Sequence, residues 1–150
     1  MNNRWRSRKA IFLSVLAVLC LISVSKGAEK SIKKVCINGI CVQAEIADSE
    51  AEKTRGLMYR ASLGWESAML FIFDQEARYS FWMKNMLIPL DIIWIDSDKN
   101  IIDITQNALP CKEQSGCGSI FPASQIKYVL EVNSGFAERS KIRIGDKVEF

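Results

Sequence analysis

Residues 68–73 read Ala-Met-Leu-Phe-Ile-Phe, and this short apolar run decides the fold class. The continuous stretch from Met69 to Phe73 is too short for an ordinary helix and is typical of a strand covered on both faces. Two more strand-like segments follow at residues 79–84 and 90–95, of which the second reads Leu-Asp-Ile-Ile-Trp-Ile. Three such segments in close succession predict a sheet at the centre of the domain.

The sequence around this run predicts a single sheet with little helix. Ser49 and Glu52 have capping-box spacing and open a short helix that we expect to reach about Met58. Residues 134–140 predict one or two helical turns. Further strands are expected at residues 33–46 (as a hairpin), 101–106, 127–132 and 147–150. The predicted fold class is α+β, mostly β, as a compact twisted sheet or partly closed barrel with one short helix near the start of the domain.

The composition excludes several classes of protein. The chain has 150 residues, enough for one domain, and is 49% hydrophobic and 25% charged, which excludes a disordered or low-complexity protein. It contains no histidine. Ser-His-Asp and Cys-His catalysis, imidazole zinc sites and a histidine pH switch are therefore excluded.

The N-terminus has the layout of a secretory signal peptide. A basic stretch at residues 4–9 precedes an apolar run from Ala10 to about Val24, and small residues follow. The run is short for a membrane-spanning helix, which needs about 20 residues. We expect residues 1–27 to direct export and residues 28–150 to form a single periplasmic or secreted domain.

The processing of this segment stays open. Cleavage after Gly27 and cleavage after Ser25 both place small residues at the required positions. An uncleaved segment would instead anchor the domain in a membrane. Lipidation at Cys20 is not expected, because the bulky Leu19 stands where a lipoprotein site needs a small residue.

The charge of the exported part argues against a nucleic-acid partner. The whole chain has 20 Lys and Arg against 17 Asp and Glu, a formal charge of +3. Five of these cations and no acid lie in residues 1–27, so the rest of the chain has 15 cations against 17 acids, about −2. Nucleic-acid binding requires a basic surface that this balance does not predict.

Cys36 and Cys41 flank a predicted hairpin turn. Asn38-Gly39 between apolar neighbours is typical of a two-residue turn, since both positions need a positive φ. In such a hairpin the two cysteines lie opposite each other in a non-hydrogen-bonded pair, with Cα atoms about 4.5 Å apart. That separation suits a disulfide, which would fix the register of the two strands.

Cys111 and Cys117 form a second close pair after Pro110. A disulfide there would fasten a surface loop. The gaps within the two pairs, four and five residues, do not match a zinc site with closely spaced thiolates, and no Cys-x-x-Cys is present for redox chemistry. In an oxidising compartment we expect two structural disulfides, while four cysteines formally allow three pairings.

A polar turn in the middle of the chain resembles the start of a calcium loop. Its residues are Asp96-x-Asp98-x-Asn100, but Ile101 and Asn107 occupy the positions that need Gly and an acidic ligand. We interpret it as a hairpin turn in which Asp and Asn bond the local backbone. Neither a metal nor another cofactor is expected.

Asp91 is the acidic residue with the strongest case for a functional role. Asp91 and Asp96 point to opposite faces of one strand, which disfavours a catalytic carboxylate pair. An acid between two apolar strand residues is costly unless it is paired. We therefore expect a buried ion pair, with Arg55 or Lys84 as the natural partner.

Residues 80–85 read Ser-Phe-Trp-Met-Lys-Asn. With the alternation of a strand, Ser80, Trp82 and Lys84 share one face. A tryptophan beside a lysine suits a sugar ring or an anionic ligand. The same pattern fits a core tryptophan next to a lysine that reaches the surface.

Several segments resemble the signature of one protein family. They are Arg55-Gly56-Leu57-Met58-x-Arg60, Met69-Leu70-Phe71-x-Phe73, Phe81-Trp82-Met83-Lys84-Asn85, Ile88-Pro89-Leu90-Asp91-Ile92, Val129-Leu130-Glu131-Val132-Asn133-x-Gly135 and Ile144-Gly145-Asp146-x-Val148. Over residues 33–150 the chain resembles the domain of unknown function 192 family, also called uncharacterised protein family 0127. Ala68 and Met86 depart from the pattern, where Gly and Thr are usual. The resemblance implies a compact β-rich fold with a small helical part, often behind a signal peptide, and no agreed activity, cofactor or catalytic residue.

The sequence favours a non-catalytic module that binds a small ligand or an envelope protein, because no nucleophile–base pair is recognisable. The candidate ligand-binding residues are Arg55, Trp82, Lys84, Asn85 and Asp91. One alternative is a carboxylate-dependent hydrolase or transferase that uses Asp91 with Arg55 or Lys84. Another is an envelope assembly or stability factor, which predicts an exposed apolar patch. Contact with a membrane is expected only through the N-terminal segment, if that segment stays uncleaved.

Overall fold

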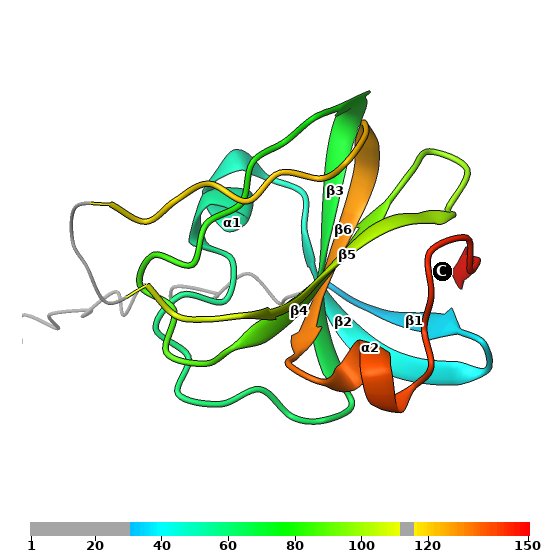
Figure 1. Ribbon diagram of the computed structural model, residues 1–150, viewed down its shortest axis with the longest axis horizontal. Coiled ribbons are helices and arrows are strands. Elements are labelled where there is room, and N and C mark those ends of the chain that lie inside the picture. The colour runs from blue at the N-terminus through cyan, green and yellow to red at the C-terminus, as the bar shows by residue number, and fades with distance from the viewer. Residues whose placement is uncertain (1–30, 112–115) are drawn as a thin grey trace, which may run out of the picture.

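A computed structural model describes residues 31–111 and 116–150, and the expected signal peptide lies outside these described residues. In this part of the chain seven strands form one sheet in the order β5-β4-β6-β3-β2-β1-β7 (Figure 1). The strands are β1 (Ile32–Ile37), β2 (Ile40–Ala47), β3 (Ser67–Ala77), β4 (Leu90–Ile95), β5 (Ile101–Ala108), β6 (Ile126–Asn133) and β7 (Val148–Glu149). Two short helices, α1 (Glu50–Arg55) and α2 (Phe136–Arg139), accompany the sheet.

The sheet curls into a half-barrel, because the two ends of the strand order approach each other. The Val148 N–H donates to the carbonyl of Lys99 at 2.9 Å, and the Ile101 N–H donates to the carbonyl of Asp146 at 2.9 Å. β2 and β3 are parallel and α1 lies in the connection between them, whereas the other paired strands are antiparallel. The predicted mostly-β fold class is confirmed.

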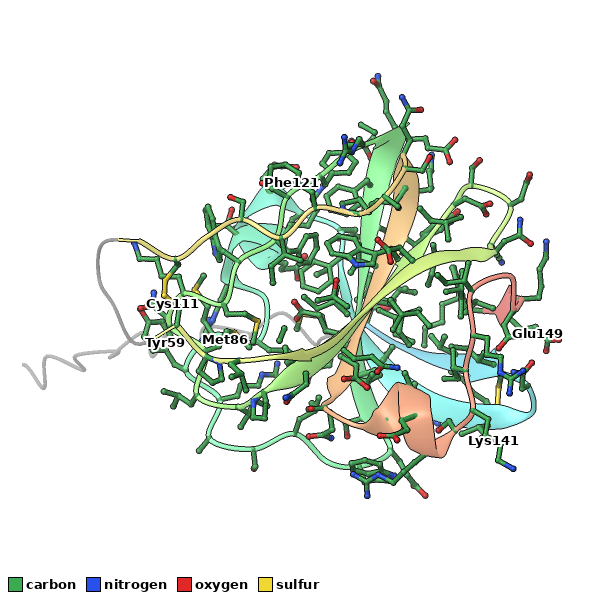
Figure 2. All side chains as sticks on the ribbon, in the orientation of Figure 1. Tyr59, Met86, Cys111, Phe121, Lys141 and Glu149 are labelled. Atoms are coloured by element: carbon green, nitrogen blue, oxygen red, sulfur yellow. A yellow bond between two sulfur atoms is a disulfide. The ribbon has the colours of Figure 1, made fainter. Side chains whose placement is uncertain are left out.

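Alternating side chains divide the apolar residues into two clusters, one on each face of the sheet. On β4, Ile93 and Ile95 belong to the inner cluster, which β1, β2, α2 and β7 enclose, while Ile92 and Trp94 belong to the outer cluster. Side chains fill both sides of the strands in Figure 2. The run from Met69 to Phe73 contributes to both clusters, which confirms the prediction of a strand covered on both faces.

The hairpin of β1 and β2 has the predicted turn and register. Asn38 and Gly39 have φ of 52° and 79°. Cys36 pairs with Cys41 across the strands and forms a disulfide with a Cα–Cα distance of 4.0 Å. Cys111 and Cys117 form the second disulfide, with Cα atoms 5.7 Å apart. Both expected pairings are therefore confirmed.

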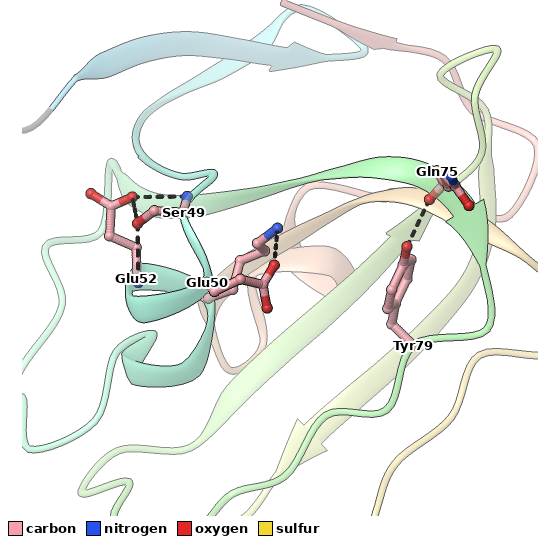
Figure 3. A network of polar contacts seen from close by, with 6 residues as sticks. Ser49, Glu50, Glu52, Gln75 and Tyr79 are labelled. Carbon is pink, nitrogen blue, oxygen red and sulfur yellow. Dashed lines mark hydrogen bonds and ion pairs between the residues drawn. The ribbon is translucent and has the colours of Figure 1, made fainter.

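α1 begins as the sequence predicts and ends earlier. Ser49 and Glu52 form the capping box, in which the Glu52 backbone N–H donates to the Ser49 hydroxyl and the Ser49 backbone N–H donates to the Glu52 carboxylate (Figure 3). The helix stops at Arg55 because Gly56 adopts a φ of 48°, outside the helical region. The predicted extension to Met58 is wrong.

The strand predicted at residues 79–84 is also wrong. This segment makes only two isolated bridges, Phe81 with Ile120 and Lys84 with Cys111. Phe81 packs on the sheet although the segment does not pair with a strand. Its ring lies edge-on to Phe71, with centroids 4.9 Å apart. The apolar residues of this segment alternate because they are buried against the outer face of the sheet, and not because the segment forms a strand.

Candidate functional site

A pocket of about 190 Å³ lies on the outer face of the sheet, between α1 and the segment at residues 79–86. Aromatic side chains form much of its wall, namely Phe71, Phe73, Tyr79, Phe81 and Trp82. The end of α1 and the turn after it contribute Lys53, Thr54, Arg55, Gly56, Leu57 and Met58. β6 contributes one acid, Glu131. The pocket thus combines an apolar body with few polar groups, as small-molecule sites usually do.

Glu131 is the polar group buried in this pocket. β6 places it on the outer face of the sheet between Met69 of β3 and Ile92 of β4. Its side chain is only 5% exposed, and Oε2 has no hydrogen-bond partner. A buried polar atom is normally hydrogen-bonded, so an unsatisfied one in a pocket wall marks a position that a ligand can complete.

Burial raises the pKa of Glu131 to about 8, and the nearby charge of Arg60 opposes this effect only in part. Arg60 directs its guanidinium at another carboxylate, with hydrogen bonds of 2.5 and 2.6 Å to Glu45. Glu131 therefore has no hydrogen-bonded counterion at Oε2 and is neutral near pH 7. A neutral carboxyl group carries a proton that it can donate.

Gly56 packs closely against the pocket wall. Its backbone N–H donates to the Glu52 carbonyl at 2.8 Å, which holds the glycine at the end of α1. A Cβ at this position would lie 3.3 Å from Cζ of Phe71 and 3.9 Å from Oε2 of Glu131. A side chain would thus press on the Phe71 ring, and the positive φ further restricts the position to glycine.

Of the predicted site residues, Arg55 and Trp82 line the pocket. Trp82 is 46% exposed, so the interpretation as a core tryptophan is wrong. Lys84 is exposed and does not line the pocket. The amide nitrogen of Asn85 lies 3.7 Å from the sulfur of Met58, so Asn85 supports the pocket wall from outside. The structure therefore brings together two of the five residues and places a third beside them.

Asp91 lies on the opposite face of the sheet and takes no part in the pocket. Its carboxylate is fully buried and accepts hydrogen bonds from the backbone N–H groups of Asn107 (2.9 Å) and Ala137 (3.0 Å). The expected ion pair with Arg55 or Lys84 is wrong. Backbone donors satisfy the carboxylate instead, and one of them is an N–H at the start of α2, which has no side-chain cap of its own.

Glu131 was not among the predicted site residues, although the sequence contains a signal for it. The acid stands in Val129-Leu130-Glu131-Val132, within a predicted strand. An acid inside an apolar strand costs free energy unless it is paired, and no basic residue occurs in this stretch. Asp91 was selected because it stands in an apolar strand, and Glu131 meets the same criterion.

The turn at residues 96–100 is a hairpin turn, as interpreted from the sequence. The Asp96 carboxylate accepts hydrogen bonds from the backbone and side-chain amides of Asn100, at 2.7 and 3.0 Å. Across residues 31–111 and 116–150, no three Cys, Asp or Glu side chains group as a metal site would require. No helix within those same residues is long and apolar enough to cross a membrane.

The curled sheet, its two short helices and the outer pocket define a small β-rich half-barrel domain. The model of the domain of unknown function 192 family, described as "Uncharacterized ACR", matches residues 33–150. The chain belongs to this family, as its sequence motifs indicate.

Relatives of the chain occur in archaea and bacteria. A UPF0127 protein of Pyrococcus abyssi is 31% identical over 110 residues, which are 72% of this chain and 86% of that protein. A crystal structure of a protein of unknown function from Novosphingobium aromaticivorans is 35% identical with a TM-score of 0.76, over 85% of this chain and 91% of that one. A Sinorhizobium meliloti structure, for which a role as a transcription regulator has been suggested, is 31% identical with a TM-score of 0.74, over 82% and 96% of the two chains. The family and the fold are thus shown, and no activity comes with them.

Proposed function

We propose that the protein is an exported, non-catalytic module that binds a small ligand in the pocket at the end of α1. One observation carries the proposal: the pocket is lined by a buried acid, Glu131, whose Oε2 has no hydrogen-bond partner in the protein. A ligand that reaches this atom gains a hydrogen bond without displacing an existing one. Aromatic side chains around it supply apolar contact.

The size of the pocket limits the ligand. An apolar cavity of about 150 Å³ holds a benzene molecule. The pocket volume of about 190 Å³ therefore suits one substituted ring or a molecule of similar bulk. An oligosaccharide is too large to be enclosed, although part of one can still rest on the exposed face of Trp82.

Binding is favoured over catalysis because two other polar groups at the pocket are already engaged. The Lys53 ammonium pairs with Glu50 at 2.8 Å, and the Tyr79 hydroxyl donates to the carbonyl of Gln75 at 2.9 Å (Figure 3). Carboxylate catalysis of the hydrolase type needs two acids in one cleft. Among the described residues that line the pocket Glu131 is the single acid, and Asp91 lies across the sheet.

The two disulfides support the export part of the proposal. Disulfides persist in oxidising compartments, such as the periplasm or the extracellular space. The N-terminal sequence, with its basic stretch and apolar run, has the layout of a signal peptide. We place the domain in the periplasm or outside the cell.

A protein partner is the second candidate, because exposed apolar side chains lie near one another. Tyr59, Leu87 and Leu109 are 66%, 58% and 65% exposed. They come from neighbouring loops: the Tyr59 N–H donates to the carbonyl of Asn85 at 2.9 Å, and Tyr59, Met86 and Cys111 lie at one end of the molecule (Figure 2). An envelope partner that docks there would be recovered by pull-down from an envelope extract.

Two tryptophans provide a matched test of the pocket. Trp82 lines the pocket and is 46% exposed, whereas Trp65 is 44% exposed and packs against Arg139 and Phe136 of α2. Thermal shift and tryptophan fluorescence with a panel of single-ring metabolites and envelope fragments should identify ligands. Trp82→Ala should weaken binding about tenfold or more, as expected for loss of an aromatic contact, while Trp65→Ala should leave it unchanged. Ligands that bind Trp82→Ala as tightly as the wild type would remove the pocket assignment, and turnover of a ligand would remove the non-catalytic one.

A further inference from the structure

The geometry points to Glu131 as the hydrogen-bond donor to the ligand, and to a ligand that presents a carbonyl or carboxylate oxygen on a body about the size of one ring. This inference rests on the proposed function and specifies its chemistry. It assigns Glu131 the role of a neutral acid and excludes an amine as the preferred ligand.

The first support is the position of the carboxyl group. Met69 and Ile92 flank Glu131 on the neighbouring strands, so apolar side chains border it on both sides within the sheet. Gly56 and Phe71 pack on a third side, where a Cβ on Gly56 would stand 3.9 Å from Oε2 and 3.3 Å from Cζ of Phe71. Glu131 also lines the pocket, so a ligand that fills the pocket lies beside this residue.

The second support is the set of charges that face the carboxyl group. From the loop after α1, Arg60 contributes a positive charge that Glu45 of β2 already pairs. From α1 itself, Lys53 and Arg55 line the pocket. None of these groups hydrogen-bonds Oε2, and burial keeps the pKa of the acid at about 8. The carboxyl group is therefore protonated at neutral pH and offers an O–H to an acceptor.

The remaining groups near the pocket oppose a cationic ligand. Lys53 and Arg55 place two positive charges at the pocket, of which Glu50 pairs one. The Lys53 ammonium lies 5.3 Å from the centroid of the Phe73 ring, so a cation of the protein already uses this aromatic wall. An arriving amine would meet both charges, whereas a carbonyl or carboxylate oxygen would be attracted by them.

The donor role gives binding a definite pH dependence. If only the protonated form of Glu131 binds the acceptor, affinity is constant below the pKa of the acid and falls above it. With that pKa at about 8, affinity should fall about tenfold between about pH 7 and pH 9. Binding of an amine would have the opposite slope, because the ionised carboxylate would attract it. Tyr79 also lines the pocket, and its hydroxyl donates a hydrogen bond to the carbonyl of Gln75.

Three probes with the same ring separate these cases: benzamide, benzoate and benzylamine. Each is titrated into the full exported domain at about pH 7 and pH 9, and binding is followed by NMR through the Gly56 amide and the Trp82 indole N–H. We expect benzamide or benzoate to bind most tightly and to lose about tenfold in affinity at the higher pH. Trp65→Ala, at a tryptophan that packs on α2 and does not line the pocket, should give the wild-type result.

Two variants test the donor itself. Glu131→Gln keeps an N–H donor and should bind benzamide with no dependence on pH, whereas Glu131→Met has no donor and should bind it about tenfold more weakly at pH 7. Tighter binding of benzylamine, or affinity that rises with pH, would overturn this inference and leave the proposed function standing. Failure of all three probes to shift the Gly56 and Trp82 signals at about 10 mM would overturn both.

Discussion

Glu131 and Asp91 are the two acids buried among the described residues, and their surroundings give them opposite properties. Asp91 accepts two backbone hydrogen bonds, one at each oxygen, so both of its oxygens have partners within the protein. Glu131 has an unpartnered oxygen and apolar strand neighbours, which stabilise a neutral acid. Sequence context alone makes the two look alike, since each stands in an apolar strand.

The raised pKa of Glu131 predicts a loss of stability with rising pH. The folded chain holds this proton more tightly than the unfolded chain, because its pKa rises from 4.5 to about 8. The resulting stabilisation is fully present below about pH 4.5 and disappears as the pH rises to about 8. Over this range the wild type should lose roughly 4 kcal/mol relative to Glu131→Gln, which lacks the titration.

Urea unfolding of both proteins between about pH 5 and pH 9 measures this difference. Subtracting the two unfolding free energies at each pH removes the contribution of every titratable group that both proteins contain. A gap between the two stability curves that stays constant with pH would mean that Glu131 ionises normally.

Asp91 should be a structural residue whose loss affects folding alone. Asp91→Asn replaces one accepting oxygen by an NH₂ group that faces a backbone N–H, and should cost about 2 to 4 kcal/mol of unfolding free energy. Asp98→Asn, at an exposed turn position, is the matched control and should change stability by less than about 0.5 kcal/mol. Denaturant unfolding checks both values. Reduced ligand affinity in a folded Asp91→Asn protein would contradict the placement of Asp91 outside the site.

At the scale of elements, the end of α1 controls the pocket. Gly56→Ala should destabilise the protein by about 1 kcal/mol or more through its positive φ, and should weaken binding because the added Cβ pushes on Phe71 in the pocket wall. Gly39→Ala is the matched control, because Gly39 has a φ of 79° and open space around it. Thermal unfolding and a binding titration distinguish the two. Undiminished binding by Gly56→Ala would show that the pocket wall beside this residue does not contact the ligand.

The hairpin disulfide should contribute modestly to stability. Its loop is so short that constraint of the unfolded chain is worth only about 2 kcal/mol, and the strands pair along their whole length without it. Replacing Cys36 and Cys41 together by serine should therefore leave a folded protein, as shown by chemical denaturation. Loss of folding would mean that the bridge holds the sheet closed, and the same double change at Cys111 and Cys117 provides a comparison.

Elements with strong local signals were predictable from sequence, and elements fixed by distant contacts were not. Asn38-Gly39 and the Ser49–Glu52 capping box act within a few residues, so their geometry could be predicted in detail. Residues 79–84 alternate like a strand, yet they lie across the outer face and pair only at isolated bridges. Their position depends on packing between Phe81 and residues far along the chain.

The candidate site illustrates the same limit at the scale of the whole molecule. Arg55 and Trp82 line the pocket together with Glu131. Glu131 lies on β6, about 50 residues after Trp82 in the chain. The curl of the sheet brings these segments together, and no local pattern specifies it. Asp91 was given the wrong partners because its actual ones, two backbone amides, leave no trace in the sequence.

Export of the whole protein predicts the state of its cysteines. When the full chain is expressed in a bacterium, the domain should appear in the periplasmic fraction or the medium. Peptide mapping after alkylation should find Cys36 linked to Cys41 and Cys111 linked to Cys117. Recovery in the cytoplasm with four free thiols would contradict the proposed location and leave the pocket unaffected.

The protonation of Glu131 in the presence of a ligand tests the central claim most directly. NMR of ¹³C-labelled glutamate side chains follows each carboxyl group through its titration. We predict that Glu131 titrates near pH 8, as its raised pKa requires, and that benzamide raises this pKa further because the ligand binds the protonated form. A midpoint near the ordinary value of 4.5 that benzamide does not change would contradict the account.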